Sequence, residues 1–189
     1  TEQKAAKAYQ TEATAISKKR RASAPKLAAA ITSAMQGLGM QGGVFEVALT
    51  ALDAPAEAGL EDVGFLVAGH AGSTPRPVGK VASGGELSRI ALAISVVTSQ
   101  LGTAQTLIFD EVDAGVGGAV AETVGRLMKQ LGLDRQVLAV THLPQVAACA
   151  DQHLVVAKQL QGKSTESRVS QVVNSDRVNE IARMLGGAQ

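Results

Sequence analysis

The chain has 189 residues and a formal net charge of +1, a length that suffices for a globular domain with a hydrophobic core. Hydrophobic residues make up 46% of the sequence, which excludes a disordered chain, and aromatic residues only 2%, which predicts an aliphatic core. With so few aromatic rings the chain has no platform for stacking unpaired bases. Its near-neutral charge provides no global attraction to nucleic acid.

Cysteine content and hydropathy indicate a reducing, non-membrane setting. Cys149 is the single cysteine, so an internal disulfide framework is excluded. No apolar run reaches transmembrane length, and the N-terminus lacks the layout of a signal peptide. We therefore expect a cytoplasmic protein without a membrane partner.

Residues 1–36 are rich in alanine, lysine and glutamate and contain one proline, Pro25, which predicts a helix in one or two parts. Few apolar residues precede Pro25. We therefore expect the first half to stay outside the globular core, as the end of a longer coiled coil would. The basic run Lys18-Lys19-Arg20-Arg21 is open to two interpretations, a solvated helix face or a phosphate contact.

After a glycine-rich break at residues 37–43, alternation of polar and apolar residues predicts strands at 45–52 and 63–68, with loops at 53–61 and 69–79. Later segments alternate between strands and helices. Strands are expected at 106–109 and 136–141, helices at 119–131 and 143–150, a hairpin at 153–157 and 167–173 around Gly162, and a last helix at 176–185. This alternation predicts an α/β fold with a partly parallel sheet flanked by helices. The strand at 106–109 is almost wholly apolar, which is typical of a strand buried on both faces.

A capping box opens the helix that follows the long loop. Ser83 precedes Glu86 by three residues, and apolar residues at helical spacing continue to about Gly102. Gly84 and Gly85 fill the box, although glycine costs roughly 1 kcal/mol against alanine within a helix. Glycines there leave bare backbone N–H groups at a positive helix end, which suits a phosphate. An ordinary capped helix after a loop is the alternative that these four residues leave open.

Polar residues follow two of the predicted strands. Asp110 and Glu111 come after the strand at 106–109, and ligands of open α/β sheets bind at such carboxyl ends. An aspartate in this position holds Mg²⁺ in P-loop NTPases, and an adjacent glutamate is able to polarise the attacking water. A polar turn capped by Asp110 is the alternative. His142 follows the next strand and is either a hydrogen-bonded polar group or, if the two strands are neighbours, a partner of a γ-phosphate.

The phosphate-binding loop of such ATPases is missing from the sequence. No Gly-x-x-x-x-Gly-Lys-[Ser/Thr] occurs, and the glycine-rich stretch Gly37–Gly43 ends without lysine or hydroxyl. The chain thus carries the magnesium and water-handling half of a nucleotide site without the phosphate cradle.

Together these motifs resemble an ABC-type ATPase head in both order and spacing. Ala82-Ser-Gly-Gly-Glu86 is similar to the ABC signature, Thr106–Glu111 to Walker B with its catalytic glutamate, and His142 to the switch histidine. Val112–Gly118 lies where the D-loop belongs.

Among these ATPases the chain most resembles the RecN family of SMC-like bacterial DNA repair proteins. The resemblance runs from about Gly37 to the end, and residues 1–36 match in character only, as the returning helix of the family's coiled coil. It is carried by four stretches, Lys80–Arg89, Phe109–Gly118, Thr141–Ala147 and Glu180–Gly187. Two positions depart from the general ABC pattern: Ala82 replaces a leucine, and glycine near Gly117 replaces the D-loop aspartate.

The resemblance implies a C-terminal lobe of an ABC-type head at residues 37–189, preceded by the end of a coiled-coil helix at 1–36. The Walker A motif would lie on an N-terminal lobe of the same protein. Two heads would sandwich two ATP molecules in a homodimer. The residues that would contact the ATP held by the other head are Ser83, Gly84, Gly85, Glu86 and Asp113.

In the same head, the resemblance implies that Asp110 supports Mg²⁺, that Glu111 is the general base and that His142 contacts the γ-phosphate. ATP binding would join the heads and hydrolysis would separate them, in recombinational repair of DNA double-strand breaks at the nucleoid. The DNA contacts are not assignable, and the lobe alone would be inactive without Walker A. Two alternatives stay open: a non-catalytic interaction fragment, and a head lobe of another SMC-like, chromosome-organising protein.

Overall fold

The computed structural model describes residues 2–81, 83–99, 101–102, 104–161 and 164–186. It divides into two units, Thr1–Thr98 and Ser99–Gln189. The first unit contains α1 (Glu2–Gln36), β1 (Val44–Ala56), β2 (Gly59–Ala68), β3 (Arg76–Pro77), the 3-10 turn η1 (Val78–Lys80) and α2 (Gly84–Val97). The second contains β4 (Thr106–Phe109), α3 (Gly118–Leu131), β5 (Gln136–Ala139), α4 (Pro144–Cys149), β6 (His153–Gln161), β7 (Ser164–Val172) and α5 (Asn174–Met184).

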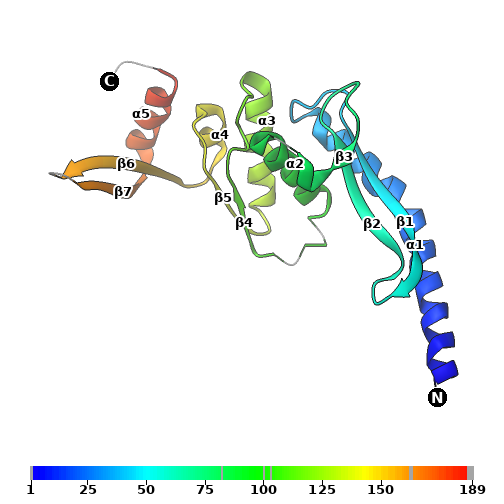
Figure 1. Cartoon of the computed structure of the whole chain (residues 1–189). Helices are drawn as coiled ribbons and strands as arrows, with labels where there is room; N and C mark the ends of the chain where they lie inside the picture. The colour runs from blue at the N-terminus through cyan, green and yellow to red at the C-terminus, as the bar shows by residue number, and fades with distance from the viewer. Residues whose placement is uncertain (1, 82, 100, 103, 162–163, 187–189) are drawn as a thin grey trace. The chain divides into compact units, whose positions relative to one another are not determined.

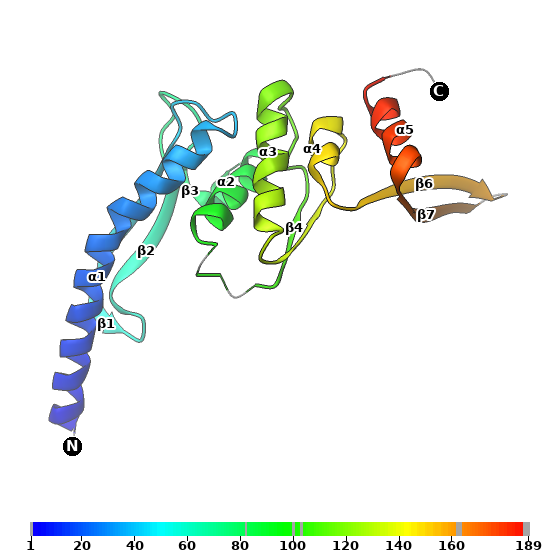
Figure 2. The same cartoon turned by 180° about the vertical axis from the view of Figure 1, so that it is seen from behind.

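Helix α1 is one continuous helix with Pro25 inside it, and it lies along the β1–β2 hairpin (Figures 1 and 2). Ala13 and Ser17 are buried, and the Tyr9 hydroxyl donates a hydrogen bond of 2.8 Å to the carbonyl oxygen of Ala56. The expectation that the first half of this helix stays outside the globular core is therefore wrong for Ala13 and Ser17, although most residues before Pro25 are exposed.

The hairpin beside α1 is longer than the sequence predicted. Strands β1 and β2 pair antiparallel from Val44↔Ala68 to Ala51↔Glu61, and pairing resumes at Ala56↔Gly59 after a register shift. The loop expected at residues 53–61 is thus mostly strand. Contacts from α1 stabilise the tip of the hairpin, where Arg20 Nη2 donates a hydrogen bond of 2.8 Å to the carbonyl oxygen of Ala58.

A buried carboxylate fixes α1 on the hairpin. Glu61 on β2 is only 3% exposed and accepts hydrogen bonds from the Ser17 hydroxyl and from Arg21, whose Nη2 lies 3.2 Å from Oε1. The Ser17 hydrogen bond, together with the charges of Arg21 and Arg20, holds the pKa of the Glu61 carboxyl below its usual value, although burial opposes this. Arg20 and Arg21, two of the four residues of the basic run, therefore bind a carboxylate of the same unit.

Helices α1 and α2 supply most of the buried side chains of the first unit, and most of these are aliphatic, as the composition predicted. The exception is Phe45, which is buried and stacks on Phe65 with ring centroids 5.8 Å apart. The other large buried side chains of this unit are Ile31, Met35, Leu38, Ile90 and Leu92. This packing fixes α2 against α1.

In the second unit β4 and β5 pair in parallel from Thr106↔Gln136 to Phe109↔Ala139, which confirms the predicted parallel portion. Helices α3 and α4 pack on each other closely enough that a Cβ at Gly125 would lie 2.8 Å from Cys149 Sγ. Strands β6 and β7 form the predicted hairpin, whose turn at Gly162 lies outside the described residues.

Helix α5 is tied to α4 by one guanidinium. Arg177 donates to the carbonyl oxygens of Ala147, Ala148 and Ala150 at the C-terminal end of α4. The last carbonyls of a helix carry its negative end, so a cation is favourable there.

The prediction that β4 is buried on both faces is wrong for this chain. Ile108 is 70% exposed and Val140, just after β5, is 63% exposed, while Phe109 is buried. Parallel strands are normally covered on both faces. Helix α3 packs against β5 on one side of this pair (Figures 1 and 2). The exposed side chains of Ile108 and Val140 leave an apolar surface on the pair.

Candidate functional site

The turn from Ser83 to Glu86 begins α2 as the capping box predicted. Ser83 has the extended backbone of an N-cap, and its Oγ accepts a hydrogen bond of 3.3 Å from the Glu86 amide. Ser83 and Gly84 are exposed, and Gly85 is buried. The positive end of α2 is therefore open at its N-cap, Ser83, and at its first residue, Gly84. Ala82 lies outside the described residues.

Packing of α2 determines which side of this turn faces outward. The buried face consists of Arg89, Ile90, Leu92 and Ala93, whereas Leu87 is 40% exposed, so the helix is rotated relative to the predicted apolar face. Burial lowers the pKa of the Arg89 guanidinium, an effect that the nearby Glu86 carboxylate partly offsets.

In the second unit Asp110 and Glu111 directly follow β4 and are both exposed. Asp110 Oδ1 accepts a hydrogen bond of 2.9 Å from the Glu111 amide. Glu111 has φ = 54°, in the left-handed region that non-glycine residues seldom adopt. Such a conformation costs about 1–3 kcal/mol and occurs frequently at functional sites. The fully buried side chain of Val112 fixes the chain immediately after this turn.

His142 follows β5, the strand that pairs with β4. The two strands run parallel, and the Val140 amide donates a hydrogen bond of 2.9 Å to the carbonyl oxygen of Phe109. The residues after both strands therefore lie at the same edge of the sheet. The His142 side chain is 70% exposed. The structure thus brings Asp110, Glu111 and His142 to one edge, while the Ser83 turn belongs to the first unit.

Asp113 joins the two loops in a way that sequence patterns did not indicate. It is 1% exposed, and its Oδ2 accepts hydrogen bonds from the Thr141 hydroxyl, from the His142 amide at 3.2 Å and from the Leu143 amide at 3.3 Å. Its Oδ1 lies 3.5 Å from Nδ1 of His142. The contact of Asp113 with a second head stays a prediction, and its carboxylate has these partners within its own unit.

The acidic residues of this edge are compatible with a magnesium site that depends on the nucleotide. Among the described residues no three His, Cys, Asp or Glu side chains are grouped as metal ligands. Mg²⁺ in nucleotide sites is held by one or two carboxylates together with water and phosphate oxygens. A single exposed carboxylate at a strand end, as Asp110 provides, is therefore sufficient.

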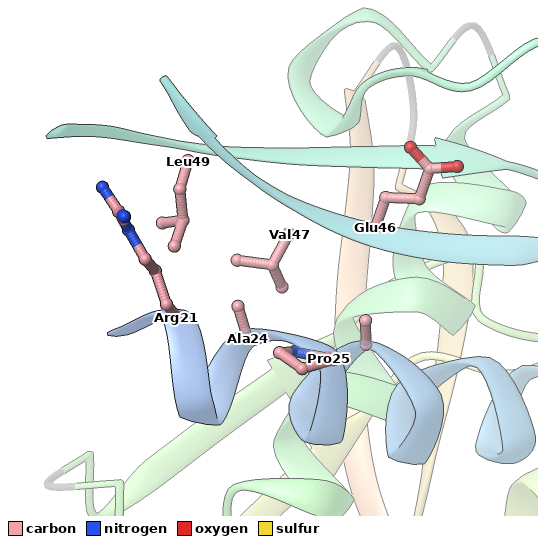
Figure 3. A pocket seen from close by; sticks show the side chains of 7 residues that line it. Arg21, Ala24, Pro25, Glu46, Val47 and Leu49 are labelled. Carbon is pink, nitrogen blue, oxygen red and sulfur yellow. The ribbon is translucent and has the colours of Figure 1, made fainter. Parts of the chain in front are cut away.

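A hollow of the first unit lies between α1 and β1, away from these motifs. Its volume is about 420 Å³, and Ala24 and Pro25 of α1 face Val47 and Leu49 of β1 across it (Figure 3). The lining is mainly apolar and offers no nucleophile or general acid–base pair. A smaller hollow of about 140 Å³ lies beside the start of α2, and sequence patterns did not indicate it. Its polar lining consists of His70, Ser73, Thr74, Arg76, Lys80 and Glu86.

Solved structures identify the class of fold. An Smc head domain with a coiled coil and joint from Pyrococcus yayanosii matches 83% of this chain and 28% of its own chain, with a TM-score of 0.58 and 21% identity. A structure described as concerning ATP-driven dimerization and DNA-stimulated activation of SMC ATPases matches 86% of this chain and 92% of its own, with a TM-score of 0.50 and 20% identity. The fold is that of an SMC head domain.

Sequence relatives identify the family within that class. The DNA repair protein RecN of Haemophilus influenzae is 42% identical over 189 residues, which cover 100% of this chain and 34% of the relative. RecN of Vibrio cholerae is 44% identical over 160 residues, covering 84% of this chain and 29% of the relative. The chain belongs to the RecN family of DNA repair proteins and aligns with their C-terminal part.

The chain spans about a third of the length of these relatives. No protein-family model matches the chain. Among the described helices none is long and apolar enough to span a lipid bilayer.

Proposed function

We propose that this chain is the C-terminal lobe of an ATP-hydrolysing head that acts in recombinational repair of DNA double-strand breaks, in the cytoplasm at the nucleoid. In this proposal residues 1–36 are the end of a coiled coil and residues 37–189 the lobe. The observation that carries it is the meeting of Asp110, Glu111 and His142 at the carboxyl ends of two adjacent parallel strands. Membership of the RecN family supports the role in repair.

Each residue of the site has a task in this proposal. Asp110 binds Mg²⁺ together with the nucleotide phosphates, and Glu111 takes a proton from the attacking water. His142 donates a hydrogen bond to the γ-phosphate. Two ATP-bearing heads pair, and the open end of α2, with Ser83 and Gly84 exposed, faces the γ-phosphate held by the other head.

The missing phosphate cradle comes from an N-terminal lobe of the same protein. Two observations support this partner: the sequence contains no Walker A motif, and the β4–β5 pair presents apolar side chains without a covering layer. A lobe that packs on this face would cover Ile108 and Val140 and bring its own lysine to the nucleotide. We call this chain together with such a lobe the complete head.

The test of this function is Glu111→Gln in the complete head. The amide keeps the size of the side chain but does not accept a proton, so we expect ATP binding within about twofold of the unchanged protein and turnover lower by about 10²–10⁴-fold. Binding is measured by calorimetry and turnover by phosphate release. Glu122→Gln, the same substitution at an exposed position of α3, is the matched control and should hydrolyse ATP at the normal rate.

A normal rate for Glu111→Gln would remove Glu111 as the base. The competing function is a non-catalytic interaction module, which the absence of Walker A favours. Under the proposal this chain alone binds no detectable ATP and the complete head does. Failure of the complete head to bind ATP would favour the module.

A further inference from the structure

We propose that Asp113 is a positioning residue, which fixes the loop between β5 and α4 so that His142 is held opposite Asp110 and Glu111. The inference rests on the proposed function, because it concerns how that site is organised. It differs from the expectation that Asp113 serves the other head, since every contact described here is made within its own unit.

The first argument is the location of the charge. A carboxylate that is 1% exposed has lost nearly all of its water, and an unsatisfied buried charge is strongly unfavourable. Such a group persists where several donors converge on it. Here the donors come from three consecutive residues, Thr141, His142 and Leu143, which lie about 30 positions further along the chain.

The second argument is that the two carboxylate oxygens of Asp113 contact different parts of the loop. Oδ2 receives the Thr141 hydroxyl and the backbone amides of His142 and Leu143, so it binds the backbone of the loop. Oδ1 lies 3.5 Å from His142 Nδ1, so it is directed at the imidazole. The Nδ1 side of the ring therefore faces Asp113, while most of the His142 side chain stays exposed for a ligand.

The third argument is that Asp113 is itself firmly placed. Val112 is fully buried beside it, and the Val116 amide donates a hydrogen bond of 3.3 Å to the Asp113 carbonyl oxygen. The strained turn at Glu111 is two residues away on the same rigid segment. Asp113 thus links the loop that carries Glu111 to the loop that carries His142, at the ends of β4 and β5.

The test compares Asp113→Ala with Asp113→Asn in the complete head. Alanine removes both oxygens, and we expect kcat to fall about 10²-fold, the loss typical of a misplaced catalytic group, with KM for ATP unchanged within about twofold. Asparagine retains one oxygen for the loop, so we expect it to restore kcat to within about fivefold of the unchanged head. Asp151→Ala, an exposed aspartate of the same unit, is the matched control and should leave kcat unchanged.

A double-mutant cycle with His142→Ala separates positioning from a general loss of stability. If Asp113 acts through His142, Asp113→Ala should add less than about twofold to the loss that His142→Ala causes alone. Additive losses, a normal rate for Asp113→Ala, or an asparagine variant as defective as alanine would each overturn the inference.

A readout without nucleotide keeps the inference separate from the proposed function. In this chain alone, Asp113→Ala should speed hydrogen exchange at the His142 and Leu143 amides about tenfold while amides within α3 keep their rates. Unchanged exchange at both amides would overturn the inference even if the complete head hydrolyses ATP. Faster exchange in a protein whose complete head binds no ATP would refute the proposed function and leave Asp113 as the anchor of this loop.

Discussion

At the scale of single residues, Glu111 occupies a backbone conformation that its own side chain disfavours. Its φ of 54° suits glycine, whereas an L-residue pays about 1–2 kcal/mol there. The predicted general base thus stands where a glycine would be more stable. We expect Glu111→Gly to have a free energy of unfolding about 1 kcal/mol higher than Glu111→Ala. Urea denaturation of the two variants of this chain measures the difference.

The same pair of substitutions at Glu122 provides the control. Glu122 is exposed on α3 and pairs with Arg126, and both substitutions remove that pair. Within a helix alanine is favoured over glycine by roughly 1 kcal/mol, so the order of stabilities should be reversed at Glu122. If alanine were the more stable residue at both positions, the strain assigned to Glu111 would be absent.

Motifs indicated most site residues in advance, but not how they are held. Ser83 was predicted because a capping box is a local pattern, and Asp110, Glu111 and His142 because each follows an apolar strand. The intramolecular role of Asp113 was missed, since its partners lie about 30 positions away and hydrogen bonds over that distance leave no periodic signal.

At the scale of elements, the attachment of α1 to β2 depends on a carboxylate whose pKa is lowered by its partners. Such a group stabilises the fold above its unfolded pKa and loses that contribution as the pH falls through its folded pKa. We therefore expect Glu61→Gln to lower the unfolding temperature at pH 7. The deficit should shrink as the pH falls below 4.5 and through the lowered pKa of the Glu61 carboxyl, because the unchanged protein is then protonated as well.

Thermal unfolding of both proteins over that pH range is the measurement. Glu57→Gln, exposed in the turn of the same hairpin, is the matched control and should shift the unfolding temperature much less at pH 7. A Glu61→Gln protein that unfolds at the same temperature as the unchanged protein at pH 7 would show that the ionised carboxylate is not what holds the helix.

The same hairpin shows where prediction of elements from sequence stops. The sequence predicts the short strands and helices of the second unit to within a few residues. The spacing of apolar residues changes clearly there between the period of a strand and the period of a helix. The sequence predicts a loop at residues 53–61, where Asp53, Pro55 and Glu57 have low strand propensity. Contacts from Tyr9 and Arg20 to the hairpin tip override that local preference.

At the scale of the whole molecule, the apolar faces of the second unit argue for a missing layer. The sequence of β4 predicted burial on both faces, which is wrong for this chain alone. In the β6–β7 hairpin, Val156 pairs with Val169 and both are exposed, as is Leu154 on the same face. These patterns become consistent with each other if the complete head covers them.

In the proposed function, pairing of complete heads depends on the open end of α2, where Ser83 is exposed. Both Ser83→Ala and Ser83→Arg remove the hydrogen bond that Oγ accepts from the Glu86 amide, at a cost of about 1 kcal/mol in helix stability. Only arginine adds a long side chain where the γ-phosphate of the other head would approach. In complete heads that also carry Glu111→Gln, so that ATP persists, we expect sedimentation to show ATP-dependent dimers for Ser83→Ala and monomers for Ser83→Arg. Equal dimerisation of the two variants would contradict a contact between this turn and a second head, because the lost cap is common to both.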